Sequence, residues 1–129
     1  MPDLFSIDTI EVNGEGISVF SETDYPKEIR GGMHLTPRID ALNLRLRTSE
    51  PGYKTDWHLA GDPTLIIIQQ GTLRIGLHNG ETRDYKAGDA FIAKDQLPEA
   101  ITFDPQKHGH RAEVIGHEVL KAVHIKLSE

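Results

Sequence analysis

Histidine is the residue type in this chain best suited to carry chemistry. The sequence holds seven histidines and no cysteine, so a metal site would need imidazole and oxygen ligands instead of thiolates. A neutral imidazole binds Zn, Fe, Ni, Cu or Mn, and a catalytic metal site generally has three protein ligands with positions open for substrate. An imidazole also titrates near neutrality and transfers protons, especially when a carboxylate orients its other ring nitrogen.

His58 and His110 are the histidines that we single out for these roles. Either Asp95 or Glu99 could pair with His110 and orient it. His108 stands two residues before His110, and we expect a loop position for it. His124 falls in an alternating apolar segment, where a packed or hydrogen-bonded side chain is expected. The remaining histidines lie in turns or in the N-terminal arm: His34, His78 and His117.

Several other chemistries have no support in the sequence. There is no Ser or Cys nucleophile motif. Two glycine-rich segments, 13–16 and 30–32, lack the strand–loop–helix setting of a phosphate-binding loop. The formal net charge is −6, which argues against a nucleic-acid surface because that would need clustered Lys and Arg.

The elements that must position the histidines are short strands. Residues 41–47 alternate strictly, which predicts a half-buried strand. Its leucines share one face. Its polar face, with Arg45 and Arg47, is expected to be solvated, although these two arginines could contact an anionic substrate. Residues 64–70 read as a strand covered on both faces, and Asn79-Gly80 predicts a two-residue hairpin turn. The other expected strands are 72–77, 81–85, 90–93, 111–115 and 120–127, and a long loop fills 94–109.

Many short strands separated by close turns are typical of a sandwich or barrel, so we expect an all-β fold in a single domain. We divide the chain into an extended arm with edge strands over 1–40 and a barrel over 41–129. The first residues carry an early acid and no basic segment, so we expect no secretory signal. No apolar run approaches the ~20 residues of a spanning helix, and a cytoplasmic protein is therefore expected.

The segment from Gly52 to Gly71 resembles the first conserved motif of the cupins, which are small β-barrels that often hold a divalent metal. In that motif a Gly, a His-x-His pair, a Glu and a second Gly follow at set intervals. The same intervals here fall on Gly52, His58, Ala60, Thr64 and Gly71. The frame is retained, whereas two of the three metal ligands in it, at positions 60 and 64, are replaced.

Lys86–Ile92 is similar to the Gly-Asp opening of the second cupin motif, which ends in the remaining histidine ligand. Counting from Gly88 puts that ligand slot on Glu99, whereas the strand pattern that follows favours His110. We favour His110, because a longer loop costs little, and we expect residues 96–108 at the cavity mouth. Three short segments further resemble a subgroup of small cupins of largely unassigned function: 56–58, 93–95 and 109–111.

The resemblance implies a single-domain jelly-roll barrel with a ligand cavity. His58 and His110 are the expected catalytic residues and the expected ligands of any weakly bound Zn, Fe, Ni or Mn; a protein without metal is the other expectation. The side chains expected to bind the small molecule are Trp57, Thr64, Gln70, Asp95 and Glu99.

For function, the resemblance implies a protein that binds a small polar metabolite and acts on it as an isomerase, lyase or oxygenase would. The alternative is a non-catalytic binding or sensor module without metal. The resemblance also implies a homodimer. From the charge and the short apolar runs we expect no nucleic-acid or membrane partner.

Overall fold

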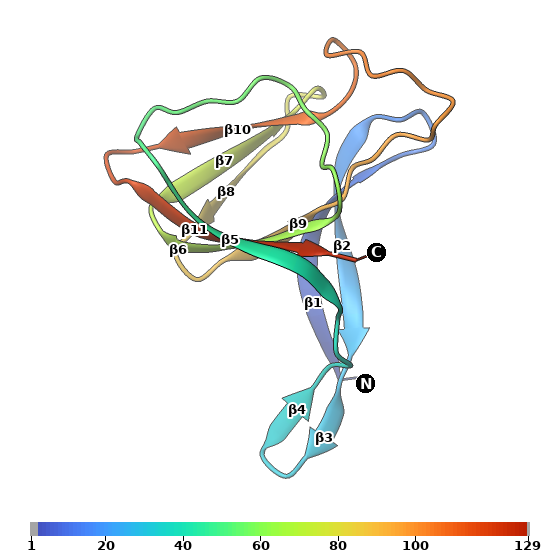
Figure 1. The fold of residues 1–129 in the computed structure, drawn as a ribbon, viewed down its shortest axis with the longest axis vertical. Coiled ribbons are helices and arrows are strands. Elements are labelled where there is room, and N and C mark those ends of the chain that lie inside the picture. Colours follow the sequence, from blue (N-terminus) through green and yellow to red (C-terminus); the bar gives the residue numbers. More distant parts are fainter. Residues whose placement is uncertain (1–2, 129) are drawn as a thin grey trace.

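A computed structural model describes residues 3–128, and these form an all-β fold (Figure 1). The strands are β1 (Leu4–Val12), β2 (Ser18–Pro26), β3 (Glu28–Arg30), β4 (Met33–Leu35), β5 (Ala41–Ser49), β6 (Thr64–Gln70), β7 (Thr72–Leu77), β8 (Thr82–Lys86), β9 (Ala90–Ala93), β10 (His110–Ile115) and β11 (Leu120–Leu127). The described part of the chain contains no helix that is long and apolar enough to cross a membrane.

Two sheets enclose the core. A six-stranded sheet has the order β2-β1-β9-β6-β11-β5, and a three-stranded sheet has the order β10-β7-β8. Figure 1 shows β7, β8 and β10 facing β5, β6, β9 and β11 across the middle of the molecule. The buried side chains between the sheets include Ile68 of β6, Ile75 of β7 and Phe91 of β9. The site described below lies at one end of this core.

The N-terminal part pairs with the main sheet and then leaves it. β1 pairs in parallel with β9 and antiparallel with β2, which forms the sheet edge. Residues 28–35 form the small hairpin β3–β4, which projects from the body (Figure 1), and each of its strand residues is exposed. This hairpin packs against little of its own chain.

The loop between β9 and β10 differs from expectation. Residues 94–109 contain no strand or helix, as predicted. The segment packs beside the turn between β1 and β2, where Leu97 and Ile101 lie close to Gly16. Gln96 donates a hydrogen bond to the carbonyl of Gly61 in the pocket wall, but none of residues 96–108 itself lines the main pocket, so the expected loop at the cavity mouth is found only in part.

The turn after β7 also differs in type. Gly80 has a φ of 89°, and no non-glycine residue among those described has a positive φ. The Leu77 N–H donates to the Glu81 carbonyl at 3.0 Å, which leaves three residues in the loop. A three-residue loop with glycine in the left-handed position replaces the predicted two-residue turn.

Strand β5 turns its polar face toward the pocket, whereas its leucine face was expected to point inward. Leu42, Leu44 and Leu46 are 55, 58 and 74% exposed. Arg45 and Arg47 line the main pocket, where both are exposed to solvent. The alternation of the strand was predicted correctly, and its orientation was not.

Candidate active site

His58 and His110 are brought together by backbone pairing. The N–H of each residue donates to the carbonyl of the other, both at 2.9 Å. Residues opposite each other in an antiparallel pair carry their side chains on the same face. The two imidazole rings accordingly lie with centroids 4.5 Å apart and planes tilted by 57°.

Gly109 permits this close pairing. A Cβ on Gly109 would lie 2.5 Å from the His58 carbonyl oxygen, and the residue has a φ of +87°. Both the space and the backbone conformation therefore demand glycine. The residue directly before His110 is what allows the two histidines to approach each other.

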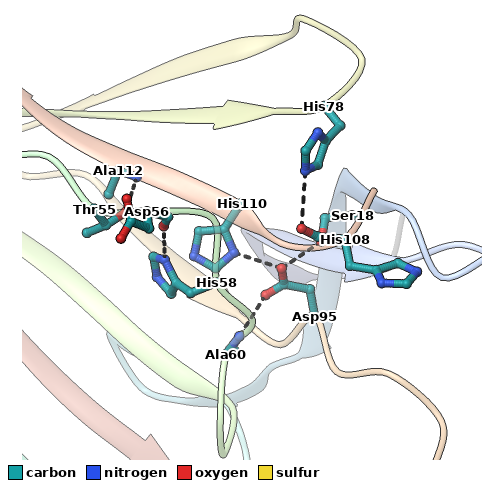
Figure 2. A network of polar contacts seen from close by, with 10 residues as sticks. All are labelled: Ser18, Thr55, Asp56, His58, Ala60, His78, Asp95, His108, His110 and Ala112. Carbon is teal, nitrogen blue, oxygen red and sulfur yellow. Dashed lines mark hydrogen bonds and ion pairs between the residues drawn. The ribbon is translucent and has the colours of Figure 1, made fainter. Parts of the chain in front are cut away.

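Asp95 holds His110 from behind. Asp95 Oδ2 lies 2.7 Å from His110 Nδ1 and accepts a hydrogen bond from Ser18 Oγ at 2.6 Å. Asp95 Oδ1 accepts one from the Ala60 N–H at 3.3 Å. Asp95 is 0% exposed, and Figure 2 shows it between Ser18 and His110. The carboxylate fixes the ring of His110 with Nδ1 as donor, which leaves Nε2 available.

His58 is held in the same tautomer by a different acceptor. Its Nδ1 lies 2.8 Å from the backbone carbonyl of Asp56, which can only accept a hydrogen bond. Burial lowers the pKa of His58 below its ordinary value, and the nearby His110 lowers this pKa further. At neutral pH, His58 therefore also presents an unprotonated Nε2.

The two rings border a pocket of about 720 Å³. Its wall combines basic side chains, three histidines and small apolar side chains from β5, β6, β9, β11 and the segment before β6. The lining residues are Asn43, Leu44, Arg45, Arg47, His58, Leu59, Ala60, Gly61, Thr64, Ile66, Ala93, His110, His124 and Lys126.

The structure brings only part of the predicted site into this pocket. Thr64 lines it, with its hydroxyl donating to the Asp62 carbonyl at 2.9 Å. Asp95 does not line it, but reaches it through His110. Glu99 is exposed on the loop and does not line the pocket. Of the two sequence alternatives, the geometry places His110, and not Glu99, beside His58.

Trp57 and Gln70 were expected in the cavity wall, and that expectation was wrong. Trp57 is stacked on His78, with ring centroids 3.6 Å apart, and the Arg111 guanidinium lies 4.7 Å from its ring centre. Gln70 Nε2 donates to the Val119 carbonyl at 3.0 Å, at the end of β6 away from the pocket. Trp57 turns outward because stacking and cation–π contacts give its ring partners there.

Several pocket and support residues were not predicted as part of the site. Ser18 lies 77 positions from Asp95 in sequence, and no local pattern reports such a contact. Arg45, His124 and Lys126 line the pocket because β5 and β11 turn their polar faces inward. The alternation of the strand puts Arg45 and Arg47 on the same face. It would have predicted both in the pocket wall if the inward-facing side of the strand had been known.

A resident catalytic metal does not fit the donor set. Ala60 offers no ligand atom, and the Thr64 hydroxyl is used by a carbonyl. Within residues 3–128 there is no group of three His, Cys, Asp or Glu side chains placed to hold an ion. The two Nε2 atoms of His58 and His110 are fewer than the three ligands of a catalytic site. A divalent ion, if it binds, should bind weakly.

His124 makes stability depend on pH. Burial lowers its pKa from 6.5 to about 4, helped by Arg47, Lys126 and Arg45 in that order. The unfolded chain therefore binds more protons than the folded one between pH 6.5 and 4, and stability should fall as pH falls through that window. The other titratable groups lining the same pocket are His58 and His110. Urea denaturation of wild type and His124→Asn from pH 7.5 to 4 tests this, because the variant should lose less stability on acidification. Parallel curves for the two proteins would contradict it.

Comparisons with known proteins agree with the fold. No protein-family model matches the sequence, and neither does any curated protein. The polyketide cyclase RemF from Streptomyces resistomycificus has a similar structure, with a TM-score of 0.51, 16% identity, and 82% of this chain and 65% of RemF covered.

Two further solved structures are similar. One is a conserved protein of unknown function from Streptococcus pyogenes, with a TM-score of 0.50, 15% identity and coverage of 74% of this chain and 70% of that one. The other is a cupin domain from Bordetella pertussis, with a TM-score of 0.48, 13% identity and coverage of 100% and 99%. The fold of this chain is therefore similar to that of RemF and of the Streptococcus pyogenes protein. At these identities the likeness concerns the fold alone.

Proposed function

We propose that the protein binds a small polar metabolite in the pocket and that His110, oriented by Asp95, transfers a proton to or from it. The observation that carries this proposal is the 2.7 Å contact between Asp95 Oδ2 and His110 Nδ1, with Asp95 fully buried. A carboxylate in this position fixes the tautomer and stabilises the imidazolium that forms when Nε2 accepts a proton.

His58 supplies a second proton-transfer group. Its Nε2 is left free by the bond from Nδ1 to the Asp56 carbonyl, and its ring is adjacent to that of His110. One imidazole can remove a proton from a bound molecule, and the imidazolium so formed can return that proton to another position of the molecule or pass it to the adjacent ring. This pairing suits an isomerase or a lyase, which moves protons without an external redox partner.

Deuterium exchange tests the proposal without requiring that the product be identified. The protein is incubated in deuterium oxide with a panel of small hydroxy and keto compounds, both neutral and anionic, and NMR follows loss of carbon-bound protons. We expect exchange with wild type and a fall of about 10²–10⁴-fold in His110→Ala, the range for losing a general base. His117→Ala, in the turn after β10, is the matched control. Binding without exchange would contradict proton transfer and would favour the non-catalytic binding module.

We also propose that the protein forms a homodimer through the outer face of its large sheet. Side chains on adjacent strands form two apolar rows there, Leu46–Val123–Ile67 and Leu44–Ile125–Leu65. Three strands of this length present on the order of 400 Å², about half of the ~800 Å² that each partner buries in a stable interface.

The projecting β3–β4 hairpin supplies the remaining apolar surface. Ile29, Met33 and Leu35 on it are 62, 58 and 38% exposed. An isolated two-stranded hairpin is marginal in water, so contact with a second copy would stabilise it. Two such uncovered surfaces on one chain suit a two-fold pairing.

Light scattering after size-exclusion chromatography checks the dimer. Wild type at micromolar concentration should have twice the chain mass, and Leu46→Glu should shift it to the monomer, because each copy would bury a charge at the interface. Val119→Glu, at a position 40% exposed in the turn before β11, should remain dimeric. A monomeric wild type would rule this proposal out.

A further inference from the structure

Three basic side chains, those of Arg45, Arg47 and Lys126, line the pocket. Within residues 3–128 the ion pairs involve other basic groups, and no hydrogen bond or ion pair joins any of these three to a carboxylate. Arg45 and Arg47 are exposed and Lys126 is half-buried, so these cations line the pocket in contact with solvent, are held by no carboxylate of the described residues, and are available to a bound anion.

Among the described residues, no Asp or Glu lines the pocket wall. The chain as a whole has 20 acidic residues against 14 Lys and Arg. The charged and titratable residues of the pocket wall are therefore cations and histidines, although the chain as a whole is acidic. Asp95 lies behind His110 and is occupied by Ser18 and Ala60 as well, so it does not neutralise the basic side.

The strand register concentrates these charges. Arg45 is opposite His124 on β11, and Lys126 is opposite Asn43 on β5. The charges act across the cavity, since Arg47, Lys126 and Arg45 each help to lower the pKa of His124 to about 4. A bound anion would be attracted by the same three charges that disfavour protonation of His124.

We infer that the pocket binds a small organic acid with two or more negative charges, held by Arg45, Arg47 and Lys126. This inference names the ligand class of the pocket and so rests on the proposed function. The anionic groups would lie against β5 and β11, and the carbon skeleton would extend toward His58 and His110.

The apolar part of the wall favours an organic anion over an inorganic one. Ile66 and Ala93 also line the pocket. Apolar surface gains from covering carbon and gains nothing from a compact, hydrated ion. Inorganic phosphate should therefore bind more weakly than a dicarboxylate of similar charge.

Isothermal titration calorimetry at low ionic strength tests the inference. The probes are succinate, malonate and citrate, with succinamide as the neutral analogue of succinate and inorganic phosphate as the anion without carbon. At least one of the three organic anions should bind wild type, and Arg45→Gln or Arg47→Gln should weaken that binding about tenfold or more, as expected for a lost charged hydrogen bond. Arg30→Gln, on the exposed strand β3, removes the same charge outside the pocket and should change affinity little.

A second readout is the His124 imidazole signal followed by NMR during the same titration. A bound anion among the three cations should raise the pKa of His124, whose lowering they share. No binding of any organic anion, succinamide binding as tightly as succinate, or equal effects of Arg30→Gln and Arg47→Gln would each overturn the inference. Anion binding without deuterium exchange would support it while contradicting proton transfer, so the two proposals fail separately.

Discussion

Gly109→Ala should be the most destabilising of the single glycine substitutions in this chain. A Cβ there would lie 2.5 Å from the His58 carbonyl oxygen and 2.8 Å from its carbonyl carbon, and the neighbouring atoms are backbone that cannot rotate away. The positive φ costs an L-residue about 1–2 kcal/mol, and forced displacement of packed atoms adds about 1–3 kcal/mol. Urea denaturation should show a loss of about 2–5 kcal/mol.

Gly116→Ala is the matched control. Gly116 has a φ of +82°, and nothing lies within 4 Å of the position that a Cβ would take there, so only the backbone cost of about 1–2 kcal/mol applies. If Gly109→Ala were no more destabilising than Gly116→Ala, the close pairing of His58 and His110 would be wrong.

Replacing Asp95 should damage both stability and chemistry. Asp95→Ala leaves the Ser18 hydroxyl, His110 Nδ1 and the Ala60 N–H without their shared acceptor. Each buried group left without a partner costs about 1–3 kcal/mol, so the free energy of unfolding should fall by about 3 kcal/mol or more. Deuterium exchange should also fall by about 10²-fold or more, because His110 loses the group that orients it.

Asp95→Asn separates the two effects. The amide can still accept from Ser18 and His110 with its oxygen, but its NH₂ group then meets the Ala60 N–H, so a smaller loss of stability is expected. The loss of the charge should keep the exchange rate low. Asp56→Ala is the control, because the contact to His58 is made by the backbone carbonyl of Asp56 and should persist. Full exchange in Asp95→Asn would contradict the role given to the carboxylate.

Much of the fold was predictable from local pattern. Residues 64–70, 72–77, 90–93 and 120–127 were expected as strands, and β6, β7, β9 and β11 have these same bounds. Each segment has apolar or β-branched residues with a turn-forming glycine or polar residues at its ends, and period-two alternation is a property of the strand itself. Such signals need no knowledge of distant contacts.

The orientation of β5 could not be read from its pattern. Alternation shows that the leucines share one face and the arginines the other, but not which face meets the body. At this sheet edge the polar face of the strand turns toward the pocket, and the leucines remain exposed in the single chain. The usual assignment of apolar side chains to the interior fails where the interior is a binding cavity.

The site was only partly predictable for a related reason. The resemblance to the first cupin motif singled out His58. The strand pattern that follows His110 singled out that residue. The support of His110 by Asp95 and Ser18 depends on side chains from three distant segments, and Trp57 leaves the cavity because His78 and Arg111 offer it contacts elsewhere. Contacts between residues so far apart in the sequence form only in the folded chain, and no local sequence pattern indicates them.

The state of the His110 ring tests the central claim most directly. Nitrogen-15 NMR of the imidazoles above pH 7 distinguishes a proton on Nδ1 from one on Nε2. The 2.7 Å contact with Asp95 Oδ2 requires neutral His110 to carry its proton on Nδ1, with Nε2 unprotonated and shifting when a ligand enters the pocket. A proton on Nε2, or an Nε2 signal that no pocket ligand moves, would contradict the assignment of His110 as the proton-transferring group.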